Sequence, residues 1–201
     1  MTIKSLQSTS LTNNIFYRSM LAGNDAYFPE FESDDFLEEV VLTSSASSVT
    51  FSGLASYATA GYKHLQIRSV ARTDRSNIVT DLAITLNGVT TSSYAWHALY
   101  ASGSSVSSAA VSNSSNIRVG SIVGASATSG HYAPTVIDLL DFNSSTKNST
   151  VRSLSGRTEG TQLWFGSGLF NSTSAVTSIE LQCESFNFVS GSRFSLYGSK
   201  A

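Results

Sequence analysis

The sequence predicts an all-β protein, a β-sandwich or barrel of about ten short strands that follows an extended N-terminal arm. From Leu37 onward, apolar residues recur with a period of two, which is typical of half-buried strands. Turn residues separate these segments at intervals of roughly 10–15 residues, and no segment has the pattern of an amphipathic helix. The chain holds 40 serines and 19 threonines but two prolines, and threonine favours strands while serine forms turns.

The N-terminal arm is expected to span residues 1–36 and to end in an acidic linker. It holds too many large apolar side chains for a free tail and too few to form a core alone. We expect it to bury them against its own sandwich or against another protein, since each buried large side chain contributes roughly 1.5–3 kcal/mol. The candidate anchoring contacts are Ile15, Phe16, Tyr17, Met20, Leu21, Tyr27, Phe28 and Phe31.

The β-sandwich body is expected to span residues 37–201. Leu65 and Ile67 alternate with polar residues, as expected for one buried strand face, and Asn87-Gly88 is the strongest turn signal in the chain. The segments with strand character are 37–42, 48–51, 64–72, 82–86, 95–100, 106–111, 116–122, 132–141, 148–157, 162–170, 176–182 and 192–198.

The low charge of these strands predicts assembly. Charged residues make up 13% of the chain, about half of the usual ~25%. A sheet face covered in hydroxyl groups stays soluble, but edges without charges or prolines are poorly protected against pairing with other strands. We therefore expect a subunit whose sheet edges are covered by neighbouring copies.

Charge divides the chain close to the same boundary. Residues 1–39 carry a net charge of −5 and residues 40–201 carry +3, and six of the fourteen carboxylates lie between Glu30 and Glu39. This acidic stretch is interpreted either as a solvated linker or as an electrostatic contact with a basic partner or with the chain's own body.

Several classes of protein are not expected. The bases are scattered without aromatic interleaving, which argues against nucleic-acid binding. No apolar run approaches the ~18 residues of a membrane helix, and the polar first residues lack the apolar region of a secretory signal. A single cysteine, Cys183, excludes an intrachain disulfide and indicates synthesis in a reducing cytoplasm.

The titratable residues do not predict chemistry. His64, His97 and His131 each stand alone in an expected strand without a partner at metal-ligand spacing. Asp138 and Asp141 lie three residues apart, so in a strand they point to opposite faces and do not form a catalytic pair. We therefore predict no catalytic, metal or cofactor site and no enzymatic activity.

The two tryptophans are the remaining candidates for a binding site. Trp96 and Trp164 offer large amphipathic rings on which a sugar of a host surface glycan would stack. Both lie among apolar residues of expected strands, so the alternative is that they belong to the core or to a subunit contact.

One pattern of strand and turn residues extends over nearly the whole chain from Ser19. It is carried by residues 19–27, 31–33, 48–51, 62–68, 71–73, 137–142, 147–152, 167–171, 175–179, 187–189 and 193–198, and the last of these, Arg193-Phe194-Ser195-Leu196-Tyr197-Gly198, is the most characteristic. This pattern resembles the tailed-bacteriophage virion structural proteins of the tail-fibre or minor structural type.

The resemblance implies a β-sandwich of jelly-roll type that forms a homotrimer on the virion surface, with other virion proteins as partners and no active-site residues. A tail-fibre or tail-appendage subunit is the expected role. The alternatives are a capsid decoration or head-fibre protein, or a carbohydrate-binding adhesin that recognises the host surface. Residues 36–39 are more acidic than the equivalent strand entry of the family, which leaves open whether the arm docks as in its relatives.

Overall fold

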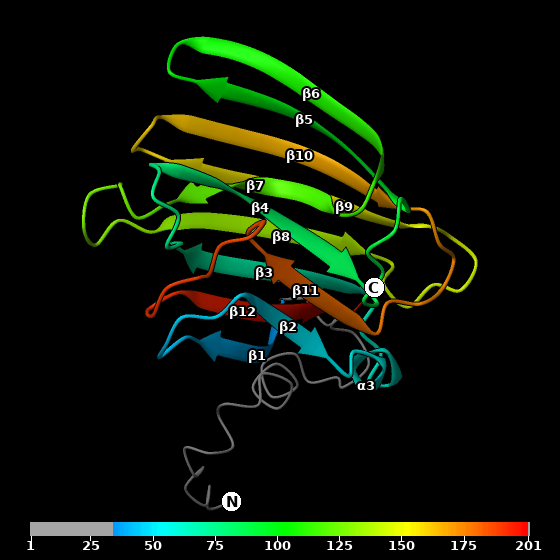
Figure 1. Ribbon diagram of the computed structural model, residues 1–201. Helices are drawn as coiled ribbons and strands as arrows, with labels where there is room; N and C mark the ends of the chain where they lie inside the picture. The colour runs from blue at the N-terminus through cyan, green and yellow to red at the C-terminus, as the bar shows by residue number, and fades with distance from the viewer. Residues whose placement is uncertain (1–33, 201) are drawn as a thin grey trace, which may run out of the picture. The chain divides into compact units, whose positions relative to one another are not determined.

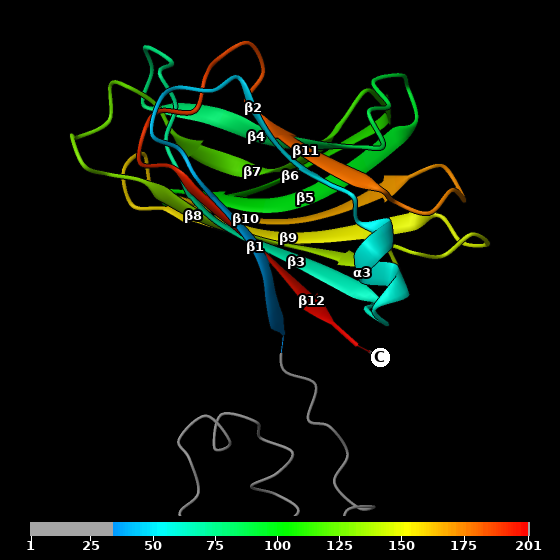
Figure 2. The ribbon, with the colours of Figure 1, turned by 90° about the horizontal axis from the view of Figure 1, so that it is seen from below.

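A computed structural model describes residues 34–200, which form twelve strands and one short helix. The strands make two antiparallel sheets that face each other, as the two layers in Figures 1 and 2 show. The prediction of an all-β sandwich is confirmed. The twelve strands coincide with the twelve segments that have strand character in the sequence, to within about three residues at each end.

One sheet has eight strands and the other has four. In spatial order, the large sheet contains β1 (Asp35–Val41), β12 (Arg193–Ser199), β3 (His64–Ala71), β8 (Ala133–Leu140), β9 (Ser149–Arg157), β10 (Gln162–Phe170), β5 (Tyr94–Ser102) and β6 (Ser105–Ser114). The small sheet contains β2 (Ser48–Ser52), β11 (Ser178–Gln182), β4 (Val79–Leu86) and β7 (Ile117–Val123), and helix α3 (Ala55–Thr59) follows β2.

The order of the strands is that of a jelly roll with two inserted hairpins. Without these hairpins, eight strands remain, four in each sheet: β1, β12, β3 and β8 in the large sheet, and β2, β11, β4 and β7 in the small sheet. The chain changes sheet at every step between them except from β4 to β7, which pair within the small sheet. The β5–β6 hairpin is inserted between β4 and β7, and β9–β10 between β8 and β11. The β9–β10 hairpin pairs with β8, and the β5–β6 hairpin pairs with β10, so β5 and β6 extend past the small sheet at the top of Figure 1.

The core lies between the sheets and follows the alternation of the sequence. In β3, Leu65, Ile67 and Ala71 are buried, while Arg68 and Val70 are exposed on the outer face. Glycines in β7 and β10 allow the two sheets to come close. A Cβ atom on Gly168, for example, would lie 3.0 Å from Cδ1 of Ile117.

The boundary of the body lies earlier than the sequence predicted. The compact unit begins at Asp34, and β1 pairs with β12 from Asp35 onward, so Phe36 belongs to the sheet and not to the arm. Asp34 forms an ion pair with Arg68, with 2.8 Å between Oδ2 and Nη2. Part of the predicted acidic linker therefore contacts the body.

The Asn87-Gly88 turn forms, but not within a hairpin. Both residues have positive φ, and Val89 donates its backbone N–H to the carbonyl of Leu86 at 3.0 Å. The next strand, β5, lies in the other sheet. Asn87 Oδ1 instead accepts the backbone N–H of Thr177 at 2.7 Å, so the turn is fixed to the segment before β11.

Candidate functional site

Five large apolar side chains are exposed together on the outer face of the large sheet. Phe165 of β10 lies directly opposite Leu154 of β9 and Leu99 of β5, and Leu163 and Val106 follow in the next row of paired residues. The exposed fractions are 52% for Leu99, 69% for Val106, 48% for Leu154, 56% for Leu163 and 54% for Phe165. We call these five residues the apolar face.

A shallow cavity of about 520 Å³ lies further along the same strands. Five of its lining residues are alanine, serine or glycine of β5, β6 and β10, and larger side chains, among them Trp96 and Val111, line the rest. Its lining includes Ala95, His97, Ala110, Ser112, Ser167 and Leu169. We call this cavity the hollow; Ser167 at its rim lies two residues from Phe165, on the same face of β10.

The apolar face and the hollow lie in an uncharged part of the sheet. Strands β5, β6 and β10 contain no aspartate, glutamate, lysine or arginine. The nearest charges on the outer face are those of Arg152 and Asp138, which neutralise each other at 2.9 Å between Nη2 and Oδ2. Strand β6 forms the exposed edge, and its ten residues include neither a charge nor a proline.

The two tryptophans lie on the inner side of the large sheet, where β5 and β10 extend past the small sheet. Trp164 is 1% exposed, and its ring stacks on Tyr100 with 5.6 Å between ring centroids. Trp96 is half-buried and lies 6.0 Å from Trp164 at an angle of 47°. Trp164 therefore offers no open face on which a sugar could stack, in agreement with the alternative that it belongs to the core.

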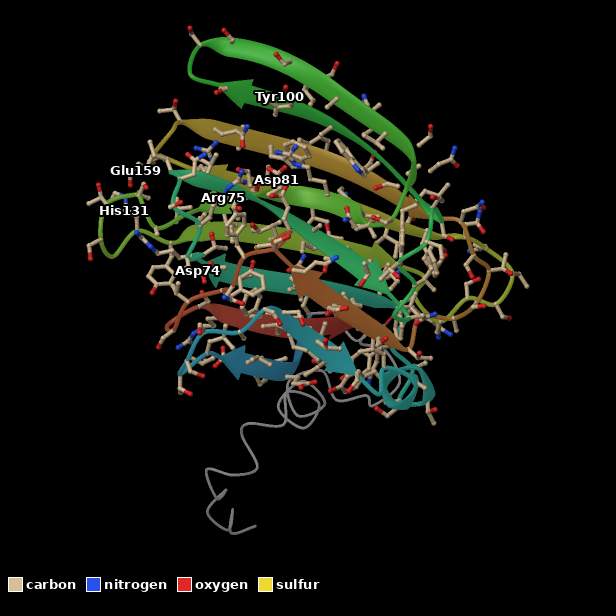
Figure 3. All side chains as sticks on the ribbon, in the orientation of Figure 1. Asp74, Arg75, Asp81, Tyr100, His131 and Glu159 are labelled. Atoms are coloured by element: carbon tan, nitrogen blue, oxygen red, sulfur yellow. The ribbon has the colours of Figure 1, made fainter. Side chains whose placement is uncertain are left out.

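A group of charged residues closes this inner side. Arg118 of β7 places its guanidinium 4.6 Å from the centre of the Trp164 ring and forms an ion pair with Asp81 of β4. Burial raises the pKa of Asp81 although Arg118 opposes the shift, and burial lowers the pKa of Arg157 nearby. Figure 3 shows Tyr100 and Asp81 on this side of the molecule. Arg118 thus acts as a cover for the tryptophan cluster.

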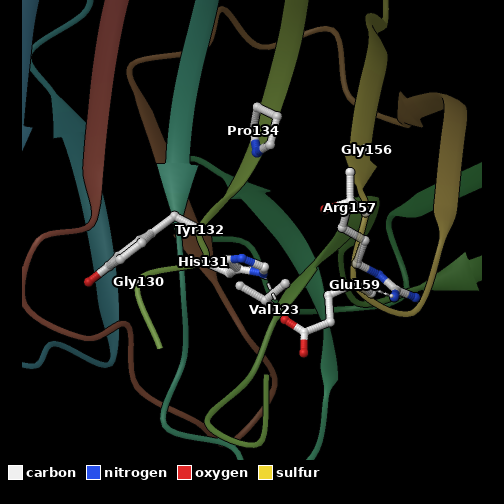
Figure 4. Close-up of a pocket in the computed structure, with 9 residues that line it drawn as sticks. Val123, Gly130, His131, Tyr132, Pro134, Gly156, Arg157 and Glu159 are labelled. Atoms are coloured by element: carbon white, nitrogen blue, oxygen red, sulfur yellow. Dashed lines mark hydrogen bonds and ion pairs between the residues drawn. The ribbon is translucent and has the colours of Figure 1, made fainter. Parts of the chain in front are cut away.

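A second cavity of about 520 Å³ lies at one end of the sandwich, beside the loops that precede β8 and follow β9. The dashed line in Figure 4 joins His131 Nδ1 to Glu159 Oε2, which are 2.8 Å apart. Glu159 also accepts the backbone N–H of Thr128 at 2.8 Å, and this hydrogen bond lowers the pKa of the carboxyl. The sequence placed His131 alone in a strand; the structure places it in a loop with a carboxylate partner.

Arg72 organises the same loop. Its guanidinium donates to four backbone carbonyls, those of Ala125, Ala127, Thr128 and His131, at 2.7–3.1 Å. A planar guanidinium presents several donors in a fixed fork and suits such a cluster of carbonyls. Sequence reasoning missed this role, since a single arginine after a strand gives no signal of the loop carbonyls that lie more than fifty residues away.

Replacing Arg72 by methionine is expected to speed backbone amide exchange in residues 124–131 by at least about tenfold, because four carbonyls lose their donor. Hydrogen exchange followed by mass spectrometry measures this. Arg72→Lys should restore protection in part, because an ammonium group lacks the fork. Arg152→Met, which removes an exposed arginine from β9, is the matched control and should leave the loop unchanged; equal exchange in all variants would contradict the role of Arg72.

The other candidate residues have separate surroundings. The ring Nδ1 of His64 accepts the backbone N–H of Asp141 at 3.0 Å, and the carboxylate of Asp141 binds Lys147 at 2.7 Å. Burial raises the pKa of the Cys183 thiol. Within residues 34–200, no three His, Cys, Asp or Glu side chains gather as a metal site would require.

The candidate anchoring contacts, Ile15 to Phe31, all lie outside the described residues. For residues 34–200, no helix is both long and apolar enough to cross a membrane. The whole chain matches no known protein-family model, and no curated protein is significantly similar to it.

Proposed function

We propose that this chain is a non-enzymatic structural protein of a bacteriophage particle, a subunit of a tail fibre or tail appendage. In this role it attaches to the particle through its N-terminal arm and displays the sandwich. Support comes from the resemblance of residues 19–198 to tailed-phage virion proteins and from the place where the chain enters the body.

The entry point is the observation that carries the proposal. Strand β1 is an edge strand, and Asp35 at its start lies opposite Gly198 near the end of β12. Both ends of the body therefore leave the sheet at one edge. The other edge, β6, lies seven strand spacings away, about 34 Å at ~4.8 Å per strand. A body held at the β1 edge presents its inserted hairpins away from the attachment.

Contacts at this edge hold the first residues of the body in place. Besides the ion pair between Asp34 and Arg68, the hydroxyl of Tyr62 donates to Asp35 Oδ2 at 2.9 Å, and this hydrogen bond raises the pKa of the tyrosine. Phe36 packs edge-on against Tyr197, with 5.8 Å between ring centroids. These contacts belong to the body, so a deletion that tests the arm should stop at residue 33.

Phage particles produced with a chain that lacks residues 1–33 are expected to lack the protein, while the shortened chain keeps its β-rich circular dichroism spectrum. The reason is that strand β1 and the whole core remain, whereas the candidate anchoring side chains are lost. Purified particles are analysed by immunoblotting with an epitope tag at the C-terminus, and the tagged full-length chain is the matched control.

A shortened chain that still joins the particles would contradict attachment through the arm. Electron microscopy of particles that carry the tagged full-length chain then locates it. Label on the tail supports the tail-fibre role, whereas label on the head contradicts it and favours the capsid decoration alternative.

A further inference from the structure

We infer that the apolar face and the hollow together bind a second copy of this chain. The inference rests on the proposed function, because an arm engaged with the particle is not available to cover this face. Four properties of the described residues favour a second copy: the area of the face, its lack of charge, its shape and the edge beside it.

The area is large enough for a stable contact. Each of the five side chains of the apolar face is about half exposed or more, which leaves roughly 100 Å² per residue and roughly 500 Å² together. The largest apolar patch on a typical monomer is about 300–600 Å² and is often functional. With its rim of serine, alanine and threonine, the surface approaches the ~800 Å² that each partner contributes to a standard interface.

The lack of charge suits a partner with the same surface. Like charges repel when a charged patch meets its own copy, but β5, β6 and β10 carry none. Arg152 at the rim is already neutralised by Asp138. A strongly charged partner would find no counter-charge on these strands.

The shape is complementary to itself. Phe165 and Leu163 project from β10, and the hollow begins at Ser167 of the same strand. One surface thus holds both a projection and a recess that accepts a side chain. The projection of one copy can enter the hollow of the next, and such a contact closes as a reciprocal pair or as a ring.

The edge beside the face also favours burial by a neighbour. Natural sheets protect long edges with lysine, proline, bulges or covering loops, because unpaired backbone groups attract other strands. Strand β6 is ten residues long and carries neither lysine nor proline, and eight of its residues are exposed. Its one register shift, opposite Ala95, lies near its C-terminal end, so the rest of this edge stays open. A second copy that lies on the apolar face would stand next to this edge and shield it.

Sedimentation equilibrium of the full chain at micromolar concentration is expected to give a multiple of 21.3 kDa. The resemblance implies three copies, and two copies would support the inference equally. Phe165→Asp should reduce the mass to that of one chain and weaken association roughly hundredfold, because it places a charge in the apolar contact. Val70→Asp is the matched control, since Val70 lies on the same outer face in β3 and is 45% exposed; it should leave the mass unchanged.

A mixing experiment tests whether the partner is a second copy. Ser167→Lys places a charge at the rim of the hollow and is also expected to give single chains. An equal mixture of the Phe165→Asp and Ser167→Lys chains should associate again, because the carboxylate of one copy meets the ammonium of the other. Circular dichroism of each variant checks that the fold is kept.

Three results would overturn the inference. The first is that the full chain is a monomer, and the second is that Phe165→Asp leaves the oligomer intact. The third is that the full chain is a monomer and that the Phe165→Asp change makes its residues 1–33 sensitive to protease. The last would mean that the arm covers the face. Mass in solution and incorporation into particles are separate measurements, so the proposed attachment is contradicted by the deletion experiment alone.

Discussion

Trp164→Ala is expected to lower the free energy of unfolding by about 3–5 kcal/mol, the range measured when a large buried aromatic side chain is removed. The indole is 1% exposed, and both the Tyr100 ring and the guanidinium of Arg118 lie against it. A Cβ on Gly166 would lie 2.6 Å from its Nε1, so the ring also lies closely against Gly166 of its own strand, β10.

Urea denaturation at one fixed protein concentration measures the loss, because association would otherwise shift the transition. Trp164→Phe keeps a ring in the site and should recover part of the stability. Trp96→Ala is the matched control, since Trp96 is half-buried and its removal should cost clearly less. If Trp164→Ala and Trp96→Ala lower the free energy of unfolding by the same small amount, Trp164 is not part of the core. That result would favour the sugar platform over the core position.

The sequence predicted the strands because alternation is a local property. The pattern in β3, with Leu65 and Ile67 buried and Arg68 exposed, is the one that the order of residues implies. The exposed apolar residues of β10 fit the same rule, since Leu163 and Phe165 alternate with Trp164 and Gly166. What alternation does not reveal is which of the two sets faces the core.

The site was not predictable because it depends on which strands are neighbours. Leu99, Leu154 and Phe165 form one row only when β9, β10 and β5 lie side by side, and β5 lies about sixty residues from β10 in the chain. The same holds for Trp164: its burial depends on Arg118, which reaches it from the edge of the other sheet. Sequence reasoning identified both tryptophans but had no means to place this cover over them.

The close contact between β7 and β9 leads to the second large effect. Gly120→Ala is expected to lower the free energy of unfolding by about 1–3 kcal/mol, as overpacking a well-packed core does. The new Cβ would lie 2.7 Å from Cβ of Ser155, a distance that real side chains do not reach. The backbone N–H of Ser121 donates to Ser155 Oγ at 3.3 Å, so pushing the strands apart also weakens this hydrogen bond. At roughly 2–4 °C per kcal/mol, the midpoint of thermal unfolding should fall by several degrees.

A double-mutant cycle separates this clash from a general cost of alanine in β7. Ser155→Gly removes the side chain that the new Cβ would meet, so Gly120→Ala should cost less in that background than in the wild-type chain. Gly156→Ala is the control on the neighbouring position of β9, where the added Cβ would lie 3.8 Å from Cδ1 of Leu163, an ordinary contact. Its effect should stay within about 0.5 kcal/mol. If Gly120→Ala lowers the free energy of unfolding equally with and without the Ser155 side chain, the new Cβ does not meet that side chain. The close packing of β7 on β9 would then be wrong.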